Sequence, residues 1–335
     1  MKIYDLRSDT VTKPSKEMLK AMNNAIVGDD VFAEDYSTNK LEDKVRELTG
    51  KDGSLFLPSG CMSNLISILV QGGKGKEILC SPTSHIMLHE IGSVSGIANT
   101  IPISVPEING LIDETKLVDF IKGDDYYTAT SAMIEIENTT NGVIYPIEKI
   151  QKISKIAKDN NIRVHIDGAR IFNSVVETGI SVSEYASYAD SFTFCLSKGL
   201  GCPVGSVLSG DKEFIKEARM YRKMIGGGMR QIGYLAEAGI YALDNNIEKL
   251  KEDHEKAKMI KEALDRLPWA EVTRYGTNMI FFKIKNAPCL TVVQKLKDKG
   301  ILALDEYNQI RFVTNLDVSF EDTLEIIKIL ENLEV

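Results

Sequence analysis

The amino-acid sequence predicts an α/β fold with two domains: a large domain built on a mostly parallel sheet and a small C-terminal α/β domain. Short strand-like apolar runs alternate with helix-like segments from residue 53 to residue 243, as in parallel sheets covered by helices on both faces. Beyond residue 247 the pattern changes to one long helix followed by shorter helix and strand pieces. A chain of 335 residues, 43% of them hydrophobic, can bury a core in each domain. We therefore predict a large domain over residues 1–245 and a small domain over residues 246–335.

The N-terminal region is predicted to form an arm and two helices. Residues 1–12 alternate between apolar and polar types too briefly for a core strand, so this segment is an arm of the large domain. A helix follows from Pro14 to residue 22, because proline is tolerated in a first helical turn. The acidic stretch 28–35 is predicted to be a loop, and a second helix over residues 38–48 is closed by Gly50.

Residues 53–66 combine a strand, a turn of small residues around Gly60 and an apolar helix. Such a turn presents backbone N–H groups and hydroxyls at a helix N-terminus, which suits a phosphate dianion. An ordinary turn with a helix-capping residue explains the same sequence equally well.

The later elements continue the alternation of strands and helices. We predict strands at residues 78–80, 100–105, 131–137, 162–167, 191–196, 204–208, 279–283 and 310–313, and helices at 114–122, 146–160, 211–224 and 232–243. The isoleucines of the segment 146–160 recur at helical spacing, which indicates core packing.

Two histidines, His85 and His89, lie one turn apart in a helix predicted to begin at Ser84. Their spacing is compatible with a metal site. However, Leu88 breaks the known zinc-binding patterns and no third histidine follows nearby, so we favour histidines that are satisfied by other groups or by solvent over metal ligands.

A lone lysine, Lys198, follows the apolar run 191–196 and precedes Gly199 and Gly201. This places it just past the carboxyl end of a strand, at the edge where open α/β sheets bind ligands. A lysine held among apolar groups is partly desolvated, which favours the neutral amine that attacks an aldehyde. A solvated turn lysine is the alternative interpretation.

The preceding strand, residues 162–167, ends in Asp167 and is followed by glycine and Arg170. Enzymes that use pyridoxal phosphate (PLP) need a lysine for the aldehyde of the cofactor, and many place an acid against its pyridine nitrogen. Asp167 and Lys198 are candidates for these two roles. Taken alone, Asp167 could also be a helix cap and Arg170 a solvated charge in a first helical turn.

Composition excludes several other classes of protein. The net charge of −8, without a basic run, disfavours nucleic acid and anionic membrane surfaces as partners. The five cysteines form no C-x-x-C pair, which predicts reduced thiols rather than a disulfide framework or a zinc site. The start of the chain lacks the apolar region of a signal peptide, and no run is long enough to span a bilayer, so we expect a cytoplasmic protein.

Six collinear motifs identify the chain as resembling the low-specificity L-threonine aldolases. They are Asp5–Thr12 (DLRSDTVT), Val27–Val31 (VGDDV), His165–Phe172 (HIDGARIF), Leu196–Gly201 (LSKGLG), Gly226–Gln231 (GGGMRQ) and Arg311–Asp317 (RFVTNLD). The resemblance runs nearly end to end, and six motifs in order are far more specific than one glycine pattern.

The resemblance implies the PLP-dependent transferase-like fold (fold type I), PLP as cofactor and an amino-acid substrate. It implies a homotetramer with active sites shared between subunits, in which Arg230 reaches the cofactor phosphate of a neighbour. The cofactor-binding residues would be Lys198, Gly60, Cys61, His85, Asp167, Arg170, Ser197 and Arg230, and the substrate carboxylate would be held by Ser8, Arg170 and Arg311. His85 would stack on the pyridine ring. No metal is implied.

The expected reaction is cleavage of the Cα–Cβ bond of threonine or allo-threonine to glycine and acetaldehyde, with Lys198, Asp167, His85 and Glu90 as catalytic candidates. A histidine that is common near the substrate hydroxyl is Tyr127 here, which leaves His85, His89, Glu90 or an ordered water as the base. Phe32, Cys61, Thr140 and Asn315 also depart from the usual family residues. The alternatives are β-elimination, racemisation or transamination on the same fold, and an inactive PLP-binding or regulatory paralogue.

Overall fold

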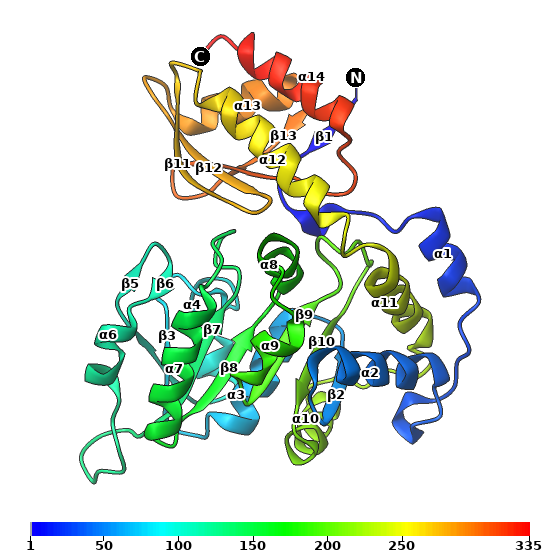
Figure 1. The fold of residues 1–335 in the computed structure, drawn as a ribbon, viewed down its shortest axis with the longest axis vertical. Helices are drawn as coiled ribbons and strands as arrows, with labels where there is room; N and C mark the ends of the chain where they lie inside the picture. The colour runs from blue at the N-terminus through cyan, green and yellow to red at the C-terminus, as the bar shows by residue number, and fades with distance from the viewer. Residues whose placement is uncertain (1) are drawn as a thin grey trace.

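The computed structural model describes residues 2–335, which form a large part and a smaller part (Figure 1). The large part is built on a seven-stranded sheet in the order β2-β10-β9-β8-β7-β3-β4. Five neighbouring strands, from β9 to β4, run parallel, whereas β10 is antiparallel to both β2 and β9. The predicted α/β fold with a mostly parallel sheet is therefore confirmed. In sheet order, the strands are β2 (Gly53–Leu57), β10 (Ser206–Gly210), β9 (Ser191–Cys195), β8 (Arg163–Asp167), β7 (Ser131–Glu137), β3 (Glu77–Cys80) and β4 (Ile101–Ser104).

Strands β10 and β9 are buried along their whole length, and so is β2 at the edge of the sheet, as expected of a sheet covered on both faces. All five residues of β2 are buried, and alternate side chains enter different clusters. Leu55 and Leu57 share a cluster with Phe214, whereas Phe56 belongs to the main core with Leu41. The helices of the large part are α1 (Lys16–Asn23), α2 (Tyr36–Thr49), α3 (Gly60–Gln71), α4 (His85–Leu88), α5 (Ser93–Gly96), α6 (Glu114–Leu117), α7 (Ile147–Asp159), α8 (Ile171–Thr178), α9 (Val182–Ser187), α10 (Lys212–Met224) and α11 (Gly233–Asn245).

Helix ends follow local chemistry. The side chain of Asp35 accepts a hydrogen bond from Thr38 N at the start of α2, and Gly50 ends this helix in the left-handed conformation at φ 68°. Ser59 caps α3 by accepting from Met62 N. The predicted helices 38–48 and 14–22 are confirmed with shifts of one or two residues.

Five stretches differ from the predicted elements. The helix expected after Ser84 is a single turn, α4, and the chain then folds back. The helix expected at 114–122 is divided into α6 and a 3-10 turn, η3 (Val118–Phe120). Two further 3-10 turns, η1 (Asp9–Val11) and η2 (Asp30–Phe32), and the hairpin of β5 (Glu107–Ile108) and β6 (Leu111–Ile112) were not predicted, because such short pieces show no periodicity.

The smaller part is a four-stranded antiparallel sheet covered by helices. Its elements are α12 (Leu250–Leu264), β11 (Ala270–Gly276), β12 (Met279–Ile284), α13 (Cys289–Asp298), β13 (Ile301–Leu302), β14 (Leu304–Asp305), β15 (Ile310–Val313) and α14 (Phe320–Glu331). The division at residue 245 stays a prediction. The N-terminal segment joins this part, because β1 (Tyr4–Asp5) pairs in parallel with β13 and Leu6 lies in the same buried cluster. Both termini therefore lie on the smaller part, in blue and red in Figure 1.

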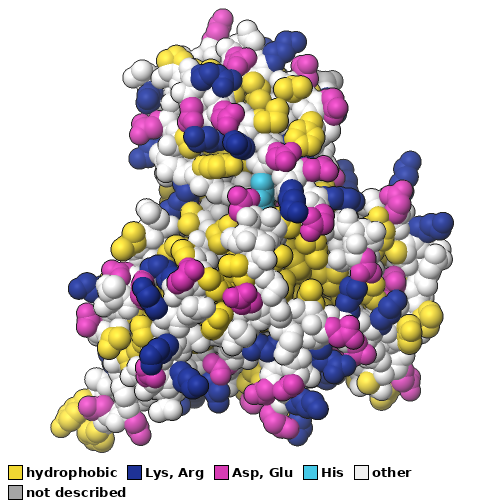
Figure 2. Space-filling model, viewed as in Figure 1, with side chains coloured by type: hydrophobic (Ala, Val, Ile, Leu, Met, Phe, Trp, Pro, Cys, Tyr) yellow, Lys and Arg dark blue, Asp and Glu magenta, His cyan; other side chains and the backbone are white. Residues whose placement is uncertain are grey.

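The surface bears acidic and basic side chains intermixed, without a large field of one sign on the face shown in Figure 2. The same view shows the smaller part above the larger one, with a narrower region between them. None of the helices formed by residues 2–335 has the length and hydrophobicity to cross a bilayer.

Candidate active site

The carboxyl ends of three parallel strands bring the main titratable residues together. Glu137 ends β7 and pairs in register with Asp167, which ends β8, and Lys198 follows β9 by three residues. Burial raises the pKa of Asp167, but the positive charges of Lys198 and His85 outweigh burial and hold that pKa below its ordinary value. The acid and the lysine singled out in the sequence are thus electrostatic neighbours, and the two positive charges favour the ionised form of Asp167.

Asp167 is held in place by hydrogen bonds to both carboxylate oxygens. Oδ1 accepts from Ala169 N at 2.9 Å, and Oδ2 accepts from Nδ2 of Asn64 at 2.7 Å. The same nitrogen of Asn64 donates to Oε1 of Glu90 at 2.8 Å. Two carboxylates on one side fix the orientation of the amide, so Oδ1 of Asn64 accepts from Nε2 of His165 at 3.1 Å. Burial lowers the pKa of His165 to about 4, so this ring is neutral.

Asn64 was not singled out in the sequence. It lies on α3, one helical turn after Gly60, and its side chain is buried. A polar residue on an otherwise apolar helix that follows a candidate phosphate turn was the available signal. This signal did not indicate a function, because the amide of an asparagine on a helix can simply face solvent.

His85 and Glu90 form a pair beside Asp167. Nδ1 of His85 lies 2.8 Å from Oε1 of Glu90, and the backbone N–H of His85 donates to Oε2 of Glu137 at 2.8 Å. Burial lowers the pKa of His85, but the hydrogen bond to Glu90 and the charge of Asp167 together raise it above its ordinary value. Because Nδ1 faces Glu90, Nε2 is the ring nitrogen left for other partners.

Cys61, His85 and Glu90 also place ligand atoms within 4.8 Å of one another. Sulfur, imidazole and carboxylate donors together are a set that zinc accepts. However, Oε1 of Glu90 already accepts from both His85 and Asn64, so a hydrogen-bond network engages this oxygen of the potential ligand set. His89 is not part of this set. Its ring centroid lies 5.4 Å from that of His85, and burial followed by the charge of His85 lowers its pKa.

Two glutamates on β7, the buried Glu135 and the half-buried Glu137, were read in the sequence only as strand residues. Burial and the charge of Asp167 raise the pKa of Glu137 to about 7, and Lys198 is among the charges that act against this shift. Glu135 lies two residues earlier, and burial and the charge of Glu137 raise its pKa well above the ordinary value. Neither oxygen of Glu135 has a hydrogen-bond partner. A titratable residue at a strand end, as at Asp167, was the signal that identifies Glu137.

The turn before α3 has the geometry of an anion site. Gly60 and Cys61 lie in the first helical turn, where backbone N–H groups have no acceptor within the helix. A Cβ atom on Gly60 would lie 2.8 Å from Sγ of Cys195, so this position requires glycine. Burial and the charge of Glu90 raise the pKa of Cys61 to about 11, so its thiol is neutral and a weak hydrogen-bond donor. Ser197, in the lysine turn, is half-buried.

The N-terminal segment reaches this site through Asp9. Arg170 donates from Nε and Nη2 to the two oxygens of Asp9, at 2.8 and 2.6 Å. Thr12 Oγ1 donates to the carbonyl oxygens of Asp9 and Lys198. Ser8 caps the short turn that contains Asp9. Two nitrogens of Arg170 are therefore already engaged by a carboxylate of the chain.

Arg311 reaches the same region from β15. The charges of Arg170 and Asp9 both act on its pKa, which burial lowers despite the opposing charge of Glu306. Its Nη1 lies 2.6 Å from Oε2 of Glu306, and Nη2 donates to the carbonyl oxygen of Arg7 at 3.1 Å.

The remaining predicted positions lie apart from this cluster or make local contacts. Arg230 is 53% exposed and pairs with Asp29 at 2.8 Å. Tyr127 and Phe32 are exposed. Thr140 and Asn315 are buried, and both donate to backbone carbonyl oxygens, Thr140 to Glu137 and Asn315 to Asp5 and Val313.

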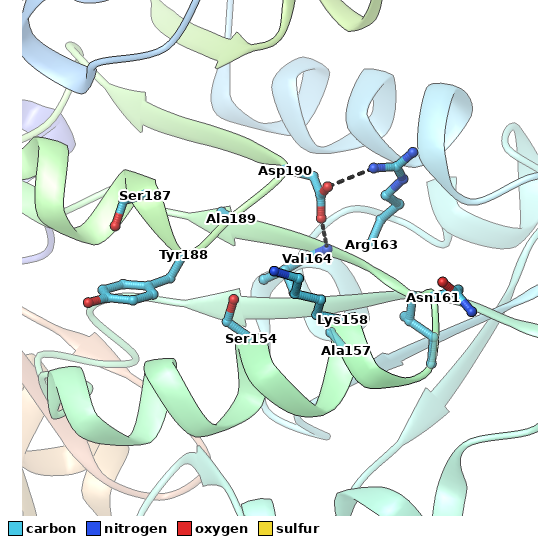
Figure 3. Close-up of a pocket in the computed structure, with 11 residues that line it drawn as sticks. Ser154, Ala157, Lys158, Asn161, Arg163, Val164, Ser187, Tyr188, Ala189 and Asp190 are labelled. Atoms are coloured by element: carbon cyan, nitrogen blue, oxygen red, sulfur yellow. Dashed lines mark hydrogen bonds and ion pairs between the residues drawn. The ribbon is translucent and has the colours of Figure 1, made fainter.

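A separate cavity lies near the amino end of strand β8, away from the carboxyl end that carries Asp167 (Figure 3). It adjoins Arg163, which begins β8, the strand that Asp167 ends. Asp190 accepts there from Nη1 of Arg163 and from Val164 N, both at 2.8 Å. The cavity lies at the amino end of β8, whereas Asp167 lies at its carboxyl end, so the candidate site is the edge at the carboxyl ends of the strands.

The chain was compared with known proteins. Residues 5–287 match the model of the family described as beta-eliminating lyase. The chain is 42% identical to the "Low specificity L-threonine aldolase" of Escherichia coli K12 over 97% of both chains. It is 40% identical to the "Probable low-specificity L-threonine aldolase 2" of Arabidopsis thaliana over 99% of this chain and 98% of the relative. The solved structure of Leishmania major threonine aldolase is 18% identical to this chain in sequence and superposes with a TM-score of 0.86 over 98% of each chain. This structural likeness confirms the predicted fold type I.

Proposed function

Because the chain belongs to the low-specificity L-threonine aldolases, within the family of beta-eliminating lyases, we propose that it is a PLP-dependent aldolase. Its substrates are L-threonine, L-allo-threonine and related β-hydroxy-α-amino acids, and its products are glycine and an aldehyde. The observation that carries the proposal is the buried carboxyl group of Asp167 at the end of β8, with Lys198 just past the end of the neighbouring parallel strand β9. Few structural roles require a buried carboxylate and a lysine at this edge.

The residues at this edge fit the cofactor group by group. Lys198 supplies an amine for the aldehyde, and Asp167 supplies an anion for the pyridine nitrogen. The first turn of α3, with Gly60 and Cys61, offers backbone donors for the phosphate. His85 supplies a flat ring to cover the pyridine. When bound, PLP supplies an electron sink for the pair of electrons released from the Cα–Cβ bond.

Asn64 and Ala169 keep the carboxylate of Asp167 ionised and oriented. Hydrogen bonds to the charged form favour that form over the protonated one. Glu90 accepts from the same amide nitrogen of Asn64. One side chain therefore fixes both Asp167, the acid for the pyridine nitrogen, and Glu90, the partner of His85.

The substrate carboxylate is assigned to Arg311, with Arg170 and Ser8 beside it. A guanidinium suits a carboxylate because it can donate two parallel hydrogen bonds. Clamping the carboxylate sets the direction of the Cα–Cβ bond, which must stand perpendicular to the conjugated ring to break. Arg170 engages Asp9 through Nε and Nη2, so its contribution comes from Nη1 and from its charge.

His85 is proposed as the base that takes the proton of the β-hydroxyl, directly or through a water. Glu90 accepts a hydrogen bond from Nδ1 of His85, which leaves Nε2 to face the substrate. The raised pKa of His85 means that this nitrogen gains its proton readily once the hydroxyl gives it up. Tyr127, which stands where the family commonly has a histidine, is exposed on its own subunit.

We further propose a homotetramer in which Arg230 approaches the phosphate site of a neighbouring subunit. In one subunit Arg230 is exposed and is held by a surface ion pair with Asp29, which costs little to break.

The test of the reaction is product analysis. Purified protein with added PLP is incubated with L-threonine, L-allo-threonine, serine and phenylserine. We expect glycine together with the matching aldehyde. Formation of 2-oxobutanoate alone from threonine would replace the aldolase assignment by β-elimination.

A further inference from the structure

The guanidinium of Arg311 is already engaged by groups of its own chain. Nη1 pairs with Oε2 of Glu306 at 2.6 Å, and Nη2 donates to the carbonyl oxygen of Arg7 at 3.1 Å. Nε is buried and has no hydrogen-bond partner. Because solvent does not reach Nε, an incoming carboxylate meets Arg311 at its two Nη atoms, and one of these holds Glu306.

Glu306 belongs to the tight turn between β14 and β15. Its backbone N–H donates to the carbonyl oxygen of Gln309 at 2.8 Å, and the two residues between them, Tyr307 and Asn308, have φ angles of 54° and 62°. The turn therefore places Glu306 directly after β14, the strand whose Leu304 pairs with Arg311. The side chains of Arg311 and Glu306 are 18% and 15% exposed. An ion pair so far removed from water is screened less than a surface pair.

We propose that Glu306 is an internal competitor of the substrate carboxylate: it neutralises Arg311 in the substrate-free protein and is displaced when an amino acid binds. Binding then exchanges one carboxylate for another at the same guanidinium. The net gain in binding free energy is smaller than it would be if the guanidinium of Arg311 had no carboxylate partner. Glu306 therefore sets the affinity for every substrate that carries a carboxylate. The inference rests on the proposed function of Arg311.

The surroundings provide a place for the displaced side chain. A cavity beside the pair is lined by Glu306, by His89 and, from the smaller part, by Arg274 and Lys283. Burial and the charge of His85 lower the pKa of His89, and the nearby charge of Glu306 opposes this shift. A carboxylate that leaves Arg311 therefore enters a space bordered by the positive charges of Arg274 and Lys283, which lowers the cost of the exchange.

The experiment uses the holoenzyme and the variant Glu306→Gln, which removes the charge and keeps the size. We expect KM for L-threonine and the Kd of glycine, measured by calorimetric titration, to fall by about three- to tenfold. The value of kcat should change less than KM. Asp305→Asn is the matched control, because Asp305 lies in the same hairpin and contacts Asn308 N rather than Arg311. Its KM should stay at the wild-type value.

A second ligand separates competition from a merely structural role. Threoninol carries the amine and the hydroxyl of threonine but no carboxylate, so Glu306→Gln should not tighten its binding. An unchanged or higher Kd for glycine in Glu306→Gln, with wild-type folding by circular dichroism, would overturn the proposal and make Glu306 a positioning residue. A wild-type protein that neither binds glycine nor cleaves threonine would instead contradict the proposed function itself.

Discussion

Asn64 donates a hydrogen bond of 2.7 Å to the carboxylate of Asp167, and this contact orients the acid at the end of β8. The same nitrogen reaches Glu90. We predict that Asn64→Ala lowers kcat for threonine cleavage by roughly 10- to 100-fold with a smaller change in KM, the usual cost of losing an orienting partner. Steady-state kinetics will measure the effect.

The control for this variant is Ser67→Ala, since Ser67 is buried on the same helix but bonds only to the backbone of Ser63. A positioning role also predicts a changed cofactor absorption spectrum in Asn64→Ala. Wild-type kcat and spectrum in this variant would exclude it.

Lys198 is predicted to carry the cofactor. Lys198→Ala should lose turnover by on the order of 10³-fold or more, because no other amine takes its place. Borohydride reduction of the wild-type protein followed by mass spectrometry of peptides should find the pyridoxyl group on Lys198. Its recovery on another lysine would refute the assignment.

The raised pKa of His85 predicts the pH dependence of cleavage. A base must be neutral to accept a proton, so kcat/KM should fall as pH decreases through the pKa of His85, and this fall should begin above the ordinary histidine value because that pKa is raised. His85→Asn should retain the cofactor absorbance, lose about 100-fold or more in glycine formation, and lose this pH dependence. If Glu90→Gln abolished activity while His85→Asn retained it, the base would be reassigned to Glu90.

Arg311 is predicted to bind the substrate carboxylate. Arg311→Ala should raise KM for L-threonine by about 10- to 100-fold, the cost of losing charge-assisted hydrogen bonds. Arg266→Ala is a suitable control, because Arg266 forms an exposed ion pair with Glu331 elsewhere on the smaller part. An unchanged KM in Arg311→Ala would remove the residue from the site.

Arg230 is predicted to complete the site of a neighbouring subunit. Arg230→Ala should weaken PLP binding, measured by fluorescence titration, without changing the mass found by light scattering. A wild-type protein that is monomeric by light scattering and fully active at the same concentration would contradict shared sites.

Local sequence was sufficient for those features that depend on near neighbours in the chain. The apolar runs of β8 and β9 and the residues that follow them predicted that Asp167 and Lys198 lie at one edge of a sheet, because parallel strands place their carboxyl ends together. Gly50 was predicted to close the second helix, and it ends α2 in the left-handed conformation. These effects act within a few residues and are therefore visible in the sequence.

Tertiary structure alone decided which distant side chains meet. No periodicity in the sequence reveals the antiparallel direction of β10 or the pairing of β1 with β13. The same holds for two side-chain contacts: the amide of Asn64 between two carboxylates, and the ion pair of Glu306 with Arg311. A buried polar group must find a partner wherever the packed chain offers one. That partner is set by the arrangement of whole elements, so its identity emerges only when the strands and helices are assembled.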